Sequence, residues 1–393
     1  MMTEMPASSF SALQRPGDLP LPHAVMASLM RRSLFLAGSN LGATSPNPSV
    51  GAVVADAKTG EIVASAVTAR GGRPHAEVLA LRQAGPRARG AILFTTLEPC
   101  SHFGATPPCA HTIVDAGISL VVYGSLDPDM RVSGRGLTWL ETHNVPAMRG
   151  EFAKEADWIN LGHALRVTER RPFVQVKLAV DAKGRVPLGG AGKPVWVTGE
   201  AARVHAHLLR ARADAILTGR KTIEADDPEL TCRLPGLQDR SPVRVILAPQ
   251  CDVPLKARVF QSERPPVWIV CGDSSKCGHL FGRRGVRIFD IGASPGGILN
   301  LGLAMMRLAG EGVTRLLVEG GPATWRGFLE AGLADEVIIM QGETDLAENA
   351  STLPFGVSGL GLITDSQSFV QVSRRKAGAD TISIYRSTLH WQI

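Results

Sequence analysis

The chain has 393 residues, of which 44% are hydrophobic and 20% are charged. This balance is typical of a globular protein of about two to three domains, and it excludes collagen-like, largely disordered and coiled-coil classes. The net charge of +6 comes from basic residues scattered along the chain, so it suits a phosphorylated metabolite at least as well as nucleic acid. The sequence shows neither an apolar signal core nor an apolar run of about 18 residues. We therefore expect a cytoplasmic protein without membrane contact, in which residues 1–22 form a disordered lead-in.

Alternating helical and strand patterns predict one α/β domain over residues 23–150. The expected elements are helix 24–37, strands 50–54 and 62–67, a helix from Pro74, strand 91–97, helix 110–116, strand 119–124 and helix 136–142. A polar helical stretch over 151–171 follows, and we expect it to be a linker because Pro172 stops the helix there.

A second alternation starts at residue 172 and predicts another α/β domain over 172–393. The expected elements are strand 172–180, helix 200–212, strands 214–219, 242–249 and 266–272, helix 297–308, strand 315–321, helix 322–331 and strand 336–340. The two halves share no motif, so the pattern indicates two different domains and no internal repeat.

Three residues of the first half have the types that bind zinc. His75, Cys100 and Cys109 each follow a proline where a helix begins or a strand ends. Zinc prefers imidazole and thiolate ligands, and a catalytic site uses three of them and leaves the fourth position open. Six cysteines are too few for a disulfide scaffold in a chain of this length, which favours free thiols or metal ligands.

Glu77 lies two residues after His75, close enough to face the open position of such a site. A carboxylate there can take a proton from an activated water and give it to a leaving amine, which is the chemistry of zinc-dependent hydrolytic deamination. The alternatives are that the cysteines are ordinary buried residues, or that His102 or His111 completes a structural zinc site. The His-x-Glu string and the two Pro-Cys pairs stand in the expected order, each at a junction between a strand and a helix. This arrangement favours the catalytic site.

Several longer strings resemble one family along most of residues 24–340. They are TSPNPSVGAVV, PHAEVLAL and LEPCSHFGATPPC in the first half, and RPFVQVKLAV, the segment from WVTGEAARVHAHLLRAR to DDPELTCR, and LLVEGGPATWRGFLEAGLADE in the second. The chain is similar here to the bifunctional deaminase-reductases of riboflavin biosynthesis. The resemblance implies a cytidine-deaminase-like three-layer domain followed by a dihydrofolate-reductase-like domain, with zinc and NADPH as cofactors, a phosphorylated pyrimidine ribotide as substrate and a homo-oligomeric assembly.

The resemblance also implies roles for individual residues. His75, Cys100 and Cys109 are expected to hold zinc, Glu77 to move the proton, and Asn47 to bind the pyrimidine. The expected NADPH contacts are Ala179, Trp196, Thr222, Asp226, Gly321, Pro322, Ala323, Thr324, Trp325, Arg326 and Gly327. The expected substrate contacts of the second half are Arg210, Leu230, Arg233 and Glu319.

Physical reasoning alone supports these second-half roles only in part. A strand that ends in two glycines before a helix suits a phosphate, and two arginines suit a ribityl phosphate. Taken alone, the residues favour a solvated helix face for Arg210 and a surface loop for Arg233. His205 and His207 lie two residues apart on a helix and cannot both face one site, so we expect both at the surface.

Two other functions fit parts of the sequence. One is a deaminase whose second half has lost catalysis, which would not oxidise NADPH. The other is a zinc-dependent nucleic-acid deaminase or binding protein, which would bind RNA with a steep salt dependence. The scattered arginines disfavour this second alternative.

Overall fold

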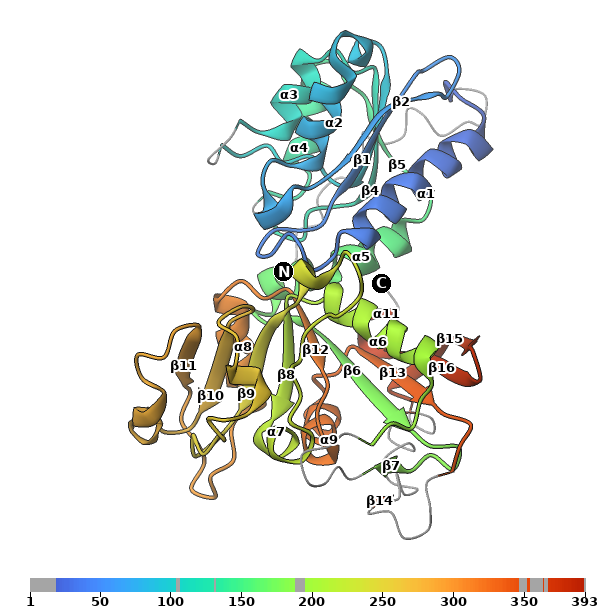
Figure 1. Cartoon of the computed structure of the whole chain (residues 1–393). Helices are drawn as coiled ribbons and strands as arrows, with labels where there is room; N and C mark the ends of the chain where they lie inside the picture. The colour runs from blue at the N-terminus through green and yellow to red at the C-terminus, as the bar shows by residue number, and fades with distance from the viewer. Residues whose placement is uncertain are drawn as a thin grey trace. The chain divides into compact units, whose positions relative to one another are not determined.

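The computed structural model describes residues 19–103, 107–130, 132–187, 195–345, 352–353, 363 and 367–391. It divides into two compact units, Met1–Thr168 and Glu169–Ile393, which are coloured along the chain in Figure 1. Of the expected lead-in, residues 1–18 lie outside the described residues. In the part of the chain that the structure describes, no helix combines the length and apolar character needed to cross a membrane.

The first unit alternates helices and strands. In chain order they are α1 (His23–Ser39), β1 (Gly51–Ala55), β2 (Ile62–Val67), α2 (Ala76–Ala84), β3 (Ile92–Leu97), α3 (Cys109–Asp115), β4 (Leu120–Ser125), α4 (Arg135–Thr142), β5 (Ala147–Arg149) and α5 (Ala153–Thr168). The strands form one sheet in the order β2-β1-β3-β4-β5. β1 is antiparallel to β2 and β3, whereas β3, β4 and β5 are parallel.

Helices cover both faces of this sheet, because its central strands are buried on both sides. Along β3, Leu93 packs with α2, α3 and α4, whereas Ile92 and Phe94 pack with α1 and α5. Successive strand residues point to opposite faces, so a continuous apolar run supplies two cores at once. The result is a three-layer α/β/α unit.

The second unit is a larger α/β unit. Its elements are β6 (Phe173–Val180), β7 (Val186–Pro187), α6 (Glu200–Ala211), β8 (Ala215–Gly219), α7 (Arg220–Asp226), β9 (Val243–Leu247), β10 (Val267–Cys271), β11 (Val286–Asp290), α8 (Leu301–Gly310), β12 (Arg315–Val318), α9 (Pro322–Glu330), β13 (Glu336–Gln341), β14 (Thr352–Leu353), β15 (Phe369–Ala377), β16 (Asp380–Ser387) and α11 (Thr388–Trp391). Nine strands form one sheet in the order β11-β10-β9-β8-β12-β6-β13-β16-β15. The strands from β11 to β13 are parallel, and β16 and β15 add an antiparallel edge.

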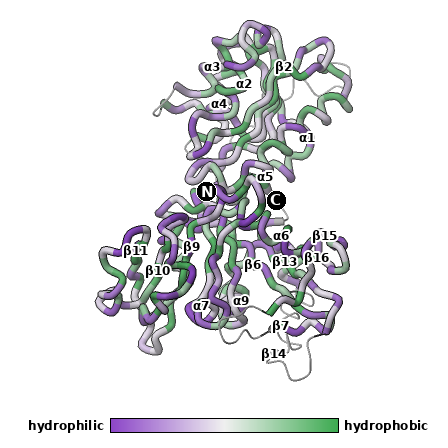
Figure 2. Tube along the Cα trace, in the orientation of Figure 1, coloured by the Kyte–Doolittle hydropathy of each residue, from purple (hydrophilic) through white to green (hydrophobic). Residues whose placement is uncertain are grey.

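This sheet also has a core on each face. α8 and α9 pack on one face, whereas α6 and the segments after β9 and β10 pack on the other. Hydrophobic residues follow the strands of both sheets, as Figure 2 shows. Because β8, β12 and β6 are parallel neighbours, their carboxyl ends meet at one edge of the sheet, where ligands bind in open α/β sheets.

Most expected elements are confirmed, and the differences follow from weak local patterns. Strands β5, β7, β11 and β14, helices α7 and α11, and the β15–β16 hairpin were not expected. The hairpin alternates exposed and half-buried residues, so it lacks a continuous apolar run. The stretch 151–171, expected as a helical linker, contains the helix α5, whose buried Ala156 and Leu165 make it part of the first unit.

The second unit also contains a disulfide that the sequence did not predict. Cys251 pairs with Cys277, and the Sγ of Cys271 lies 3.7 Å from the Sγ of Cys277. Cys100, Cys109, Cys232 and Cys271 form no disulfide.

A buried ion pair fixes the start of the second unit. Asp335, which is 2% exposed and precedes β13, accepts hydrogen bonds from both Nη atoms of Arg171 at 2.8 and 2.9 Å. The same carboxylate accepts the Val174 N–H of β6 at 2.8 Å. One carboxylate therefore joins the first residues of β6 to β13, its parallel neighbour in the sheet.

Replacing Asp335 by Ala should destabilise the second unit by about 3–5 kcal/mol, because Arg171 is left as a buried charge without its main partner. The control is Glu169→Ala, which removes the exposed partner of the same guanidinium and should cost less than about 1 kcal/mol. Hydrogen exchange of the β6 and β13 amides measures both effects. Equal hydrogen-exchange protection in the two variants would contradict the stabilising role of the Arg171–Asp335 ion pair.

Candidate active sites

Three segments of the first unit bring the predicted zinc ligands together. His75 immediately precedes α2, Cys109 is the first residue of α3, and Cys100 follows the end of β3. α2 and α3 pack on the same face of the sheet as Leu97, the last residue of β3. The ligands therefore converge at one edge of that face, although they are up to 34 residues apart in sequence.

The distances between the ligand atoms are those of a shared metal site. The Nδ1 of His75 lies 3.2 Å from the Sγ of Cys109 and 3.6 Å from that of Cys100. Zinc bonds of about 2.0–2.3 Å in a tetrahedron place ligand atoms roughly this far apart. Hydrogen bonds from Cys109 and His75 lower the pKa of the Cys100 thiol to about 4, although burial acts in the opposite direction. This residue is therefore prepared to bind a metal as a thiolate.

Glu77 lies beside these three residues. Its side chain is buried, its Oε1 accepts a hydrogen bond from Thr95 at 3.4 Å, and burial raises the pKa of its carboxyl. Among the described residues its Oε2 has no hydrogen-bond partner. A buried oxygen without a partner beside one imidazole and two thiols fits a zinc site with an open position for water.

A cavity of about 350 Å³ opens in front of this cluster. Asn47, Arg73, Glu77 and His163 are among the residues that line it. The amide of Asn47 donates to the carbonyl of Gly72 at 3.2 Å. Gly72 has a φ of 87°, and a Cβ there would lie 2.1 Å from the Asn47 side chain, so only glycine allows this contact.

The second unit has a cavity of about 550 Å³ at the carboxyl ends of β6, β8 and β12. Its lining includes the predicted residues Ala179, Trp196, Arg210, Thr222, Asp226, Leu230, Arg233, Glu319, Gly321, Pro322 and Trp325. The backbone N–H of Gly321 donates to Thr222 at 3.0 Å. This links the turn before α9 to α7 and leaves a helix start beside the cavity, which fits the phosphates of a dinucleotide such as NADPH.

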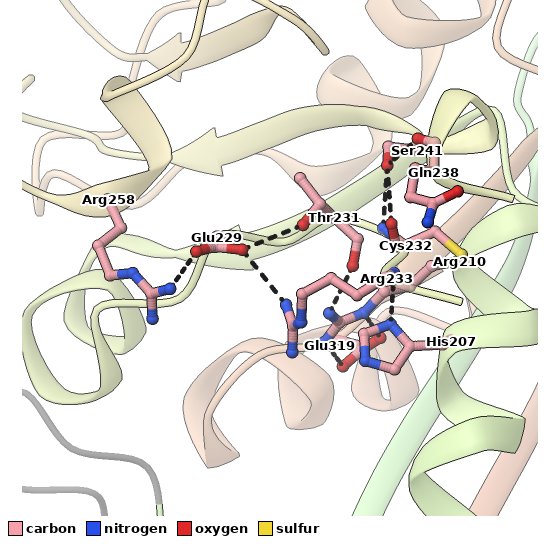
Figure 3. A network of polar contacts seen from close by, with 10 residues as sticks. All are labelled: His207, Arg210, Glu229, Thr231, Cys232, Arg233, Gln238, Ser241, Arg258 and Glu319. Carbon is pink, nitrogen blue, oxygen red and sulfur yellow. Dashed lines mark hydrogen bonds and ion pairs between the residues drawn. The ribbon is translucent and has the colours of Figure 1, made fainter. Parts of the chain in front are cut away.

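A buried ion pair organises this second cavity. The Nε and Nη2 of Arg210 donate to the two oxygens of Glu319 at 2.8 and 2.9 Å, as Figure 3 shows. The Nζ of Lys177 lies 3.7 Å from the same carboxylate. Burial alone would raise the pKa of Glu319, but Arg210 and Lys177 hold it at about 2. Glu319 is therefore an anion that fixes two cations at the cavity wall.

Comparison with known proteins agrees with the division of the chain into two units. Residues 25–125 match the cytidine and deoxycytidylate deaminase zinc-binding region, and residues 172–353 match the RibD C-terminal domain. The riboflavin biosynthesis protein RibD of Aquifex aeolicus is 36% identical over 84% of this chain and 90% of its own length. The RibD of Escherichia coli is 36% identical over 89% of this chain and 96% of its own length.

The chain belongs to the RibD family of riboflavin biosynthesis proteins. Two solved family structures, from Acinetobacter baumannii and Thermotoga maritima, superpose with TM-scores of 0.78 at 29% and 30% identity, each covering 93% of this chain and 99% of the other. The expected fold class is confirmed. The expected bifunctional enzyme, a deaminase and reductase with zinc and NADPH as cofactors, is confirmed as well.

Within this family framework, the structure separates the predicted NADPH residues into two groups. The residues that line the cavity are Ala179, Trp196, Thr222, Asp226, Gly321, Pro322 and Trp325. The others in the predicted turn, Ala323, Thr324, Arg326 and Gly327, do not line it.

Two cavity residues were missed or misjudged from the sequence. Lys177 lines the cavity from the middle of β6, where a single lysine in an apolar strand gives no signal of function. His207 was expected at the surface, and this is wrong because it is half-buried and lines the cavity. His205 is half-buried as well, but it contacts Arg375 of β15 and does not line the cavity, so the two histidines do face different surroundings.

Glu98 is a further residue that sequence reasoning missed. Its buried carboxylate accepts hydrogen bonds from the backbone N–H groups of Asp127, Gly134 and Gly136 at 3.2, 3.0 and 3.0 Å. It thereby ties the Cys100 turn to the segment that begins α4. Asp127 also lines the zinc-site cavity, so Glu98 sets the shape of that wall.

Replacing Glu98 by Ala should raise the KM for deamination roughly tenfold or more while zinc stays bound, because the cavity wall loses its acceptor but the metal ligands remain. Steady-state kinetics and metal analysis measure the two quantities. Glu61→Ala changes an exposed residue of the same unit and should leave both unaltered. An unchanged KM in Glu98→Ala would refute this role.

Proposed function

We propose that this chain catalyses two consecutive steps of riboflavin biosynthesis. The first unit would hydrolyse the 2-amino group of 2,5-diamino-6-(5-phosphoribosylamino)pyrimidin-4(3H)-one. The second would then reduce the ribosyl group of 5-amino-6-(5-phosphoribosylamino)uracil to a ribityl chain. The Glu77 carboxylate beside His75, Cys100 and Cys109 carries the proposal. The similar Thermotoga maritima protein is a diaminohydroxyphosphoribosylaminopyrimidine deaminase and 5-amino-6-(5-phosphoribosylamino)uracil reductase, which supports the choice of substrates.

In the first unit, we assign the zinc ligands as His75, Cys100 and Cys109. When bound, zinc acts as a Lewis acid that lowers the pKa of a water molecule toward neutrality. Glu77 takes a proton as the water attacks the ring carbon and gives it to the leaving amino nitrogen, so that ammonia departs. The remaining hydroxyl proton passes to the adjacent ring nitrogen, which leaves a carbonyl. Burial suits Glu77 to this, because it raises the pKa of the carboxyl above its ordinary value and so makes the carboxylate a better proton acceptor. Asn47 orients the pyrimidine.

In the second unit, Ala179, Trp196, Thr222, Asp226 and the turn from Gly321 position the cofactor. When bound, NADPH supplies the hydride that reduces the ribose carbon. Opening the sugar ring also needs a proton at its oxygen. Lys177 is the proposed donor, since its side chain is 17% exposed and Glu319 holds its Nζ beside the cavity.

The proposal includes the setting of the enzyme. We place it in the cytoplasm as a homo-oligomer that binds neither membrane nor nucleic acid. Light scattering of the purified protein tests whether it is a homo-oligomer. RNA titration at two salt concentrations tests whether it binds nucleic acid.

Glu77→Gln should lower the rate of ammonia release at least about 100-fold while retaining zinc, because general acid–base catalysis is lost but the ligands are intact. Ammonia is measured with the diaminopyrimidine ribotide, with and without NADPH. The same variant should still oxidise NADPH when given the deaminated ribotide. Unchanged ammonia release would disprove the role of Glu77, and no NADPH oxidation by the wild-type protein would indicate a second half without catalysis.

Lys177→Met should lower the kcat of NADPH oxidation by at least about 100-fold, because the proton donor is lost, and should leave deamination unaltered. Lys183→Met, which changes a lysine that is 60% exposed, serves as the control. The measurement is the decrease in NADPH absorbance with the deaminated ribotide. A kcat equal to that of the control would exclude Lys177 as the donor.

A further inference from the structure

One buried nitrogen in the wall of the first cavity has no partner. Among the residues that line this cavity, Glu77 and His163 each have a buried side-chain atom without a hydrogen-bond partner in the described part of the chain. Glu77 is used by the proposed deamination, whereas His163 has no role in it. Since buried polar groups in folded proteins are nearly always hydrogen-bonded, an exception in a cavity wall points to a missing ligand.

Contacts of α5 hold His163 at the carboxyl ends of β3 and β4. The side-chain amide of Asn160 donates to the carbonyl of Thr96 in β3 at 3.1 Å. At Gly124 in β4, a Cβ would lie 2.6 Å from the Cβ of Ala156, so a larger residue would push the helix away. His163 follows Asn160 by about one turn, and the helix therefore presents it at the edge where the sheet ends.

His163 reaches the cavity from the face of the sheet opposite to the zinc ligands. α2 and α3 pack on one face, whereas α5 packs with α1 on the other (Figure 1). The ring carbon that loses its amino group must lie beside Glu77 and the metal ligands. The ribosyl group of the substrate is attached to another ring atom, so it extends into the remaining space, on the α5 side of the cavity.

The imidazole ring of His163 is neutral. Burial lowers its pKa, as does the charge of Arg166, and the carboxylates of Asp127 and Asp129 oppose this without reversing it. A neutral imidazole carries one proton, and an unpaired buried N–H is costlier than an unpaired lone pair. The proton therefore belongs on Nε2, and the buried Nδ1 keeps its lone pair. The Nε2–H is then the donor that His163 offers to a ligand in the cavity.

The neighbouring carboxylates complete a set of groups that fits a sugar. Asp127 and Asp129 line the cavity together with His163, and their charges act on its ring. A hydroxyl group can donate to a carboxylate and accept from an N–H at the same time. A phosphate dianion has no proton to donate and is repelled by two carboxylates. This wall of the cavity therefore suits the ribosyl hydroxyls better than the phosphate.

We propose that the Nε2–H of His163 donates a hydrogen bond to a ribosyl hydroxyl of the deaminase substrate, and that this contact makes the first unit favour the ribotide over the bare pyrimidine. The inference rests on the proposed deaminase function and adds a specificity-determining residue to it. Because His163 contacts neither the ring carbon nor the leaving amino group, it contributes to binding and not to the chemical step.

The test measures ammonia release from the diaminopyrimidine ribotide without NADPH. His163→Leu should raise the KM about five- to tenfold with kcat unchanged, because one hydrogen bond is lost and a hydroxyl is left without its donor. His163→Gln, whose side-chain amide can place an N–H near the position of Nε2, should fall between His163→Leu and the wild type. Equal KM values in His163→Leu and the wild type would overturn the proposal, as would a fall in kcat alone.

Two competitive inhibitors of ammonia release separate a sugar contact from a ring contact. The deaminated ribotide retains the ribosyl group, whereas 5,6-diaminouracil is the same ring without it. In His163→Leu, the inhibition constant of the deaminated ribotide should rise by the same factor as the KM, and that of 5,6-diaminouracil should not change. An equal rise for both inhibitors would place His163 against the ring and contradict the inference.

Failure of this inference differs from failure of the proposed function. His143→Leu changes an exposed histidine of the same unit that does not line the cavity, and should match the wild type. Zinc content, and NADPH oxidation with the deaminated ribotide, confirm that each variant is folded. If the wild type releases no ammonia from the ribotide, the proposed deaminase function is wrong. If the wild type does so and His163→Leu is unaltered, the deaminase function stands and the role of His163 is wrong.

Discussion

The chemistry of the first unit depends on one constraint, that three ligand atoms from separate segments meet within a few ångströms. The end of β3 supplies Cys100, and the starts of α2 and α3 supply His75 and Cys109. The apolar residues of these segments share one core, so the packing that folds the unit also assembles the ligands. Glu77 shares a helix with the His75 turn and is therefore placed beside the ligands by the same packing.

The second unit positions its cavity by a different means, the pairing of buried charges. Glu319 follows β12, Lys177 lies on β6 and Arg210 lies on α6, so one carboxylate joins three elements. A buried charge without a partner is costly, and these pairs hold only when all three elements are in place. The more exposed Arg233 and Arg258 line the same cavity and pair with Glu229.

The sequence predicted what short-range patterns encode. The zinc ligands could be proposed from the sequence because His-x-Glu and the two Pro-Cys pairs are local motifs with a known chemistry. Glu98 was not, because its acceptor role requires knowing that the segment before α4 folds back onto β3. Lys177 was missed for a similar reason, since its position beside Glu319 depends on which strand lies beside β6. Among the elements, three-residue β5 and the half-exposed β15–β16 hairpin lack the continuous apolar runs that made other strands recognisable.

X-ray absorption at the zinc edge of the purified full-length protein tests the central assignment most directly. The account predicts about one equivalent of zinc per chain, with two sulfur ligands at about 2.3 Å and one imidazole nitrogen at about 2.0 Å, and a fourth, light-atom ligand that is not from the protein. Loss of one sulfur from this shell in Cys109→Ser would agree with it. A shell without sulfur, or zinc-free protein that releases ammonia at the full rate, would contradict it.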